Sequence, residues 1–117
     1  MKPTKQMIEN EPAGPKIDAW FAELVMEWDM ETIDFWCDPL YGWKPSSNIA
    51  HAMEGVEIAN KNGLWVWIER PIFLNWHVTF AKGKGEIDDV IDYHAEAKEL
   101  SLAITKALLL WAIEKDK

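Results

Sequence analysis

The C-terminal segment constrains the fold of this chain most strongly, because it is apolar around most of a helical circumference. From about Ala95, apolar residues recur at helical spacing. The stripe consists of Leu100, Ala103, Ile104, Ala107, Leu108 and Trp111, and it is widened by Leu102, Leu109, Leu110 and Ile113. A helix that is apolar on nearly all sides is normally buried. We therefore expect it to pack against a sheet on one side and against a second element or a partner subunit on the other.

The composition is that of one globular domain. The chain has 117 residues, 49% of them hydrophobic, which is enough to build a core without disulfides or metals. Its single cysteine, Cys37, cannot form an internal disulfide, and no apolar run reaches the roughly 20 residues of a membrane-spanning helix. The first residues, "MKPTKQMIENEPAGPK", lack the apolar core of a secretory signal. We expect a protein of the cytoplasm that has no membrane partner.

The net charge of −8, from 20 acidic and 12 basic residues, disfavours direct binding to nucleic acid. Long-range electrostatic steering favours cationic or neutral partners instead. An acidic, aromatic-rich surface could bind and inhibit another protein.

Hydrophobic periodicity divides the chain into a lead-in and a single domain. Residues 1–12 are polar and proline-rich and are interpreted as a flexible lead-in, and residues 13–117 as the domain. A helix is predicted from Pro15 to about Trp28. Residues 29–45 show no sustained period and are interpreted as an aromatic-rich ordered loop with room for a short strand.

The next elements are a helix and a pair of strands. Ser46 or Ser47 is the predicted N-cap of the second helix, whose apolar face would comprise Ile49, Ala52, Met53, Val56 and Ala59, and Gly63 is placed to end it. "LWVWIER" (64–70) is apolar on both faces, which predicts a strand covered on both sides. "NWHVTFA" (75–81) alternates as a half-buried strand does, and "VIDY" (90–93) could add a third. The predicted fold is α+β, a small antiparallel sheet with helices on both faces.

Three separated motifs resemble the phage ABA sandwich domain proteins, small proteins of tailed phages and prophages named for an α-β-α layering. The motifs are "PAGPKIDAWFAELVM", "WKPSSNIAHAMEGVE" and "AEAKELSLAITKALLLWAI", in this order over roughly residues 12–113. The matching positions are Gly14, Ile17, Asp18, Val25, Trp43, Pro45, Ser46, Ile49, Ala52, Glu57, Leu102, Ala103, Ile104, Lys106, Ala107 and Leu109. The chain departs at Thr105 and Lys106, where Cys-Arg is typical, and at Ser47 and Asn48, where Thr-Asp is typical. The resemblance implies the fold and a phage or prophage origin, but no general activity.

The sequence offers no constellation for catalysis or metal binding. The histidines at 51, 77 and 94 are far apart in sequence, and no spacing pre-forms half of a metal site. Cys37 lies near Asp34 and Asp38, whose charge would disfavour a thiolate. The acidic pairs, such as Glu54 and Glu57, and the glycine-bearing "AKGKGE" are typical of solvated surface. We therefore expect no catalytic residue, no metal and no cofactor.

The candidate binding site is the entry to the second helix together with the aromatic loop before it. Free N-terminal amides, hydroxyls and a lysine can hold a phosphate, and a nearby ring can stack on a base. The candidate ligand-binding residues are Trp36, Tyr41, Trp43, Lys44, Ser46, Ser47 and Arg70. The same residues also suit a simple capped helix entry and a loop that folds back over the sheet.

Two hypotheses for the function follow. In the first, the chain is a non-catalytic protein that sequesters a nucleotide-like small molecule at this corner. In the second, it inhibits a host protein through an acidic, aromatic-rich surface. A homo-oligomer is expected in either case, formed through exposed aromatic residues or through the last helix.

Overall fold

The computed structural model describes residues 2–36, 42–71, 74–82 and 91–115. The elements in chain order are α1 (Lys5–Asn10), α2 (Pro15–Leu24), α3 (Met30–Trp36), α4 (Ile49–Lys61), β1 (Trp65–Glu69), β2 (Trp76–Lys82), β3 (Ile91–Ala97) and α5 (Leu100–Lys115). The strands form one antiparallel sheet in the order β1-β2-β3. Its third strand extends the "VIDY" prediction to Ala97. The predicted α+β class is confirmed.

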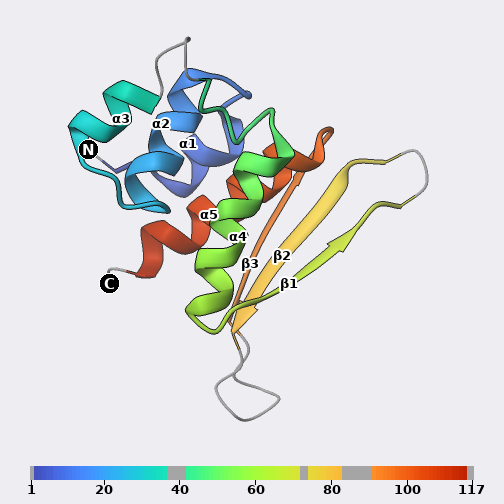
Figure 1. Ribbon diagram of the computed structural model, residues 1–117. Coiled ribbons are helices and arrows are strands. Elements are labelled where there is room, and N and C mark those ends of the chain that lie inside the picture. The colour runs from blue at the N-terminus through green and yellow to red at the C-terminus, as the bar shows by residue number, and fades with distance from the viewer. Residues whose placement is uncertain (1, 37–41, 72–73, 83–90, 116–117) are drawn as a thin grey trace.

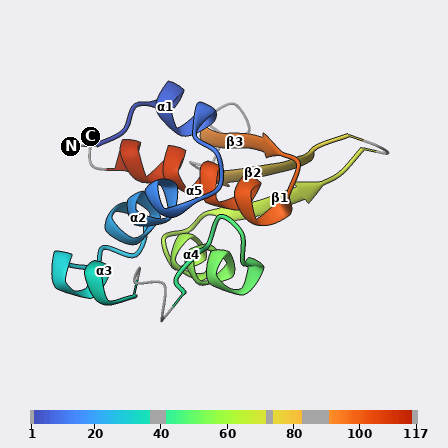
Figure 2. The ribbon, with the colours of Figure 1, turned by 90° about the horizontal axis from the view of Figure 1, so that it is seen from above.

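Helix α5 lies at the centre of the fold. It packs on β2 and β3, and it also contacts α1, α2 and α4. Figure 2 shows α5 between α1 on one side and α2 and α4 on the other. Nearly all of its residues from Ser101 to Ala112 are buried. Other helices of the same chain thus cover the apolar circumference, so α5 offers little surface for self-association.

Only one face of the sheet carries helices among the residues that the structure describes. Val78 and Phe80 of β2 are fully buried against α5, and their partners Ile68 and Val66 lie on the same face. In Figure 1 the helices all lie to one side of the strands. Trp65 and Trp67 point to the other face and are 50% and 59% exposed. The expectation that β1 is covered on both sides, with helices on both faces of the sheet, is wrong for the residues that the structure describes.

The N-terminal segment differs from the predicted lead-in, because it contains the helix α1. Thr4 caps this helix by accepting a hydrogen bond from the amide of Met7 at 3.2 Å. Ile8 is fully buried in the main core, and the ammonium of Lys106 in α5 donates to the carbonyl of Glu9 at 2.7 Å. Packing against α5 stabilises six residues that are too few to form a helix alone.

The segment between α2 and α4 also differs from its prediction. Residues 30–36 form α3, which begins where the carboxylate of Asp29 accepts a hydrogen bond from the amide of Thr32 at 2.8 Å. Residues 37–41 lie outside the described part of the chain. Helix α4 begins later than predicted, and its N-cap is Asn48, not a serine; the side chain accepts from the amides of Ala50 and His51.

The predicted apolar face of α4 is only partly correct. Ala52, Val56 and Ala59 are buried, as expected. Ile49 and Met53 are 44% and 43% exposed, because the core contacts a narrower stripe of the helix than the sequence pattern indicates. Gly63 has a φ of +87°, a left-handed conformation that suits glycine directly after a helix end.

Candidate functional site

The predicted corner around residues 43–47 is a packed joint between helices. Trp43 is buried, with its ring 6.0 Å from that of Phe21 and 4.7 Å from that of Trp28. The imidazole of His51 stacks on it at 4.9 Å with an interplanar angle of 20°. The ring surface that was expected to stack on a ligand is therefore occupied by side chains of the protein.

Ser46 connects three segments that are far apart in sequence. Its hydroxyl accepts a hydrogen bond from the amide of Gly14 at 3.1 Å, and its own amide donates to the carboxylate of Asp18 at 2.8 Å. The hydroxyl of Ser101 donates to the Ser46 carbonyl at 3.1 Å. Burial raises the pKa of Asp18, and the hydrogen bonds from Ser46 partly offset this rise. These contacts give Ser46 a structural role between α2, α4 and α5.

The remaining predicted residues do not complete a site at this corner. Lys44 and Ser47 are exposed, and their backbones serve the turn: the amide of Lys44 donates to Nδ1 of His51, and that of Ser47 donates to the Lys44 carbonyl. Tyr41 and the side chain of Trp36 lie outside the described part of the structure.

Arg70 belongs to a different region. Its guanidinium donates to the carbonyl of Leu74 at 3.3 Å and lies 5.3 Å from the ring centre of Trp76. Arg70 directly follows β1, whose C-terminal end lies beyond the helices in Figure 1. The structure therefore does not bring Arg70 to the corner at residues 43–47.

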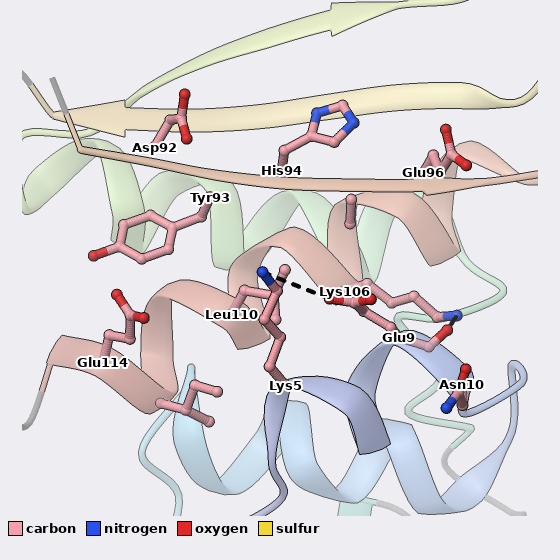
Figure 3. Close-up of a pocket in the computed structure, with 12 residues that line it drawn as sticks. Lys5, Glu9, Asn10, Asp92, Tyr93, His94, Glu96, Lys106, Leu110 and Glu114 are labelled. Carbon is pink, nitrogen blue, oxygen red and sulfur yellow. Dashed lines mark hydrogen bonds and ion pairs between the residues drawn. The ribbon is translucent and has the colours of Figure 1, made fainter.

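A cavity of about 620 Å³ lies between α1, β3 and α5 (Figure 3). Its lining includes Tyr93, Glu114, Lys106 and Lys5. Burial is the main cause that lowers the pKa of Lys106, and burial together with the nearby Glu114 carboxylate raises the pKa of Tyr93. The volume is within the range of small-molecule sites. Sequence reasoning missed this cavity because one of its walls is α1.

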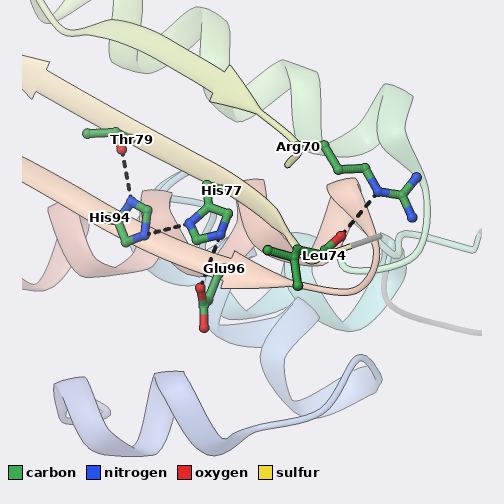
Figure 4. Close-up of polar contacts among 6 residues, drawn as sticks. All are labelled: Arg70, Leu74, His77, Thr79, His94 and Glu96. Carbon is green, nitrogen blue, oxygen red and sulfur yellow. Dashed lines mark hydrogen bonds and ion pairs between the residues drawn. The ribbon is translucent and has the colours of Figure 1, made fainter. Parts of the chain in front are cut away.

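The open face of the sheet carries a cluster that linear spacing did not reveal. His77 on β2 and His94 on β3 lie side by side, with Nδ1 of the first 3.3 Å from Nε2 of the second. Nε2 of His77 is also 3.3 Å from a carboxylate oxygen of Glu96 (Figure 4). The available signal was the alternation of the two strands, which places both histidines on their polar faces.

The same face has an aromatic part and an acidic part. Trp65 and Trp67 project from the edge strand β1, and Trp67 pairs with Thr79, which in turn pairs with His94. Glu69, Asp92 and Glu96 lie on the same face and are exposed. We name these residues, together with His77 and His94, the open sheet face.

Comparison with known proteins gave no matching family model, no matching curated protein and no matching solved structure. The resemblance to the phage ABA sandwich proteins thus stays a prediction. Within the described ranges, none of the helices has the length and apolar character needed to cross a membrane.

Proposed function

We propose that this chain is a non-catalytic binding protein that docks a protein partner on its open sheet face. The observation that carries the proposal is the exposure of Trp65 and Trp67, at 50% and 59%, on a sheet face that no helix of the described residues covers. Large exposed aromatic rings are unusual on a small protein unless they contact something, and tryptophan is among the commonest anchors of protein interfaces.

The charge of this face indicates the chemistry of the partner. Glu69, Asp92 and Glu96 lie on the same sheet face as the two tryptophans, and the whole chain carries a net charge of −8. A partner with basic side chains around an apolar patch would be complementary. In line with the family resemblance, we propose a phage or prophage origin and a host protein in the bacterial cytoplasm as this partner.

Sequestration of a nucleotide-like molecule is the second candidate, but it needs a different location. Trp43 and Ser46 are occupied by contacts within the protein, whereas the cavity between α1, β3 and α5 has a suitable volume of about 620 Å³ and two lysines in its lining. Glu9 and Glu114 line the same cavity, and their charges oppose an anion.

Native mass spectrometry of the protein recovered from phage-infected bacteria distinguishes these candidates. A co-purified protein would identify a partner, whose affinity is then measured with the purified components. We expect the double substitution of Trp65 and Trp67 by serine to weaken binding by at least about 30-fold, as for interface anchors. Ser47→Ala, at the corner around residues 43–47, is the surface control and should leave the affinity for the partner unchanged.

Two outcomes would count against docking on this face, and the behaviour of a homo-oligomer would show whether a second copy occupies it. A small added mass of nucleotide size would favour sequestration. A partner that binds the double variant as tightly as the parent would use another surface. A homo-oligomer that persists in the double variant would place self-association elsewhere, whereas one that dissociates would identify a second copy as the occupant of the open sheet face.

A further inference from the structure

Three side chains on the open sheet face present possible metal ligands at close range. One ligand atom each from His77, His94 and Glu96 lies within 4.8 Å of the other two. The antiparallel register pairs His77 directly with Glu96, and His94 occupies the next outward position on β3. Because all three residues lie on neighbouring strands, the hydrogen-bonded ladder holds their backbones in place.

The spacing of these atoms is close to that of a zinc site. With bonds of about 2.1 Å and tetrahedral angles, two ligand atoms of a zinc ion lie about 3.4 Å apart. The distance from Nε2 of His77 to the Glu96 carboxylate is 3.3 Å. Small rotations of the exposed side chains of His94 and Glu96 would bring the third ligand atom to the same spacing. Two imidazoles and one carboxylate are ligands that suit zinc better than magnesium or calcium.

Thr79 can form a hydrogen bond with the ring nitrogen of His94 that does not bind the metal, and such hydrogen bonds orient metal-binding histidines. Its hydroxyl lies 2.9 Å from Nδ1 of His94. A hydrogen bond donated by protonated Nδ1 to this hydroxyl would leave the lone pair of Nε2 free for a metal. Without a metal, the same groups can form a chain in which the Thr79 hydroxyl donates to His94, His94 to His77, and His77 to Glu96. In this metal-free chain of hydrogen bonds, both ring nitrogens of each histidine have a hydrogen-bond partner.

We infer that His77, His94 and Glu96 bind one zinc ion, with Thr79 as a positioning residue. The ion would face solvent, so water or a group from a bound molecule completes its coordination. Exposed Glu69, which pairs with His77 in the register, adds negative charge beside the site. This inference goes beyond the proposed function and does not require that a partner protein exists.

Isothermal titration calorimetry, with zinc chloride injected into metal-free protein, tests the inference. The protein must carry no polyhistidine tag, because such a tag would bind zinc itself. We expect one zinc ion per chain. Thr79→Val should weaken zinc binding about tenfold, as is typical when a hydrogen-bond partner of a metal-binding histidine is removed. His94→Ala should weaken zinc binding further. His51→Ala removes the histidine outside the cluster, and Glu57→Gln removes an exposed carboxylate on α4; neither should change the affinity.

Nuclear magnetic resonance of the imidazole nitrogens gives a readout that needs no variant. Zinc should shift the side-chain signals of His77 and His94 and leave those of His51 unchanged. Binding should also weaken as the pH falls, because protons compete for the imidazoles. Zinc affinity that is unaltered by His94→Ala, or signals of His77 and His94 that do not respond to zinc, would overturn the inference.

Discussion

Gly55 of α4 faces Phe21 of α2 and Leu108 of α5, so Gly55→Ala tests how tightly the core is packed. A Cβ atom at this position would overlap Cζ of Phe21 and would lie 2.8 Å from Cδ1 of Leu108. Both neighbours are fully buried, so neither side chain can turn into solvent to make room.

Two opposing effects determine the magnitude. Replacing glycine by alanine inside a helix stabilises it by about 1 kcal/mol when the new methyl group meets nothing. Overpacking a buried site costs up to about 3 kcal/mol. We expect the high end here, because two rigidly packed side chains are affected, and therefore a net loss of about 2 kcal/mol in the free energy of unfolding. For a chain of this length, that loss lowers Tm by about 8 °C.

Thermal and urea denaturation of the parent, Gly55→Ala and Asn60→Ala would measure this effect. Asn60 lies on the exposed side of the same helix and should gain up to about 0.5 kcal/mol from helix propensity alone. In the background of Phe21→Leu, which removes the overlapping ring atoms, Gly55→Ala should cost less than in the parent. A stabilised Gly55→Ala variant, or losses that simply add in the double variant, would refute the packing argument.

Two further predictions concern the joint between α2, α4 and α5. Ser46→Ala should lower the free energy of unfolding by about 1–3 kcal/mol, because the amide of Gly14 loses its hydrogen-bond acceptor. Ser47→Ala should change the free energy of unfolding by less than about 0.5 kcal/mol. Urea unfolding measures both values, and equal losses in the two variants would contradict the structural role of the Ser46 hydroxyl. Because burial raises the pKa of Asp18 above 3.8, the folded protein holds this proton more strongly than the unfolded chain does, so the contribution of Asp18 to stability falls as the pH rises through its folded-state pKa. Asp18→Asn should therefore gain stability relative to the parent as the pH rises from below 3.8 through the folded-state pKa of Asp18, and a difference in unfolding free energy that stays constant over this rise would contradict the assigned cause.

Elements with a strong hydrophobic period could be predicted from the sequence. The burial of α5 follows from its apolar circumference, the start of α2 from Pro15, and the faces of β2 from simple alternation. These features are local, because the period of a segment determines which of its side chains share a face. The α+β class follows from the order of such segments.

The candidate site was harder to predict, because burial depends on which segments meet. Trp43 and Ser46 are residue types that often bind ligands. In this structure the Trp43 ring packs against Phe21 and Trp28, and the Ser46 hydroxyl already accepts a hydrogen bond from the amide of Gly14. Conversely, Trp65 and Trp67 have the residue type of a core, yet they lie on the face of the sheet that α4 and α5 leave open.

The sequence alone thus determined the local elements of this protein, their apolar faces and the class of the fold. The tertiary structure decided that residues 5–10 form a helix against α5 and that the corner at residues 43–47 is a packed joint between helices. It also brought His77 and His94 side by side, although they are 17 positions apart in the sequence. The physical reason is that local periodicity acts over one or two turns, whereas strand register and burial arise from contacts between distant segments.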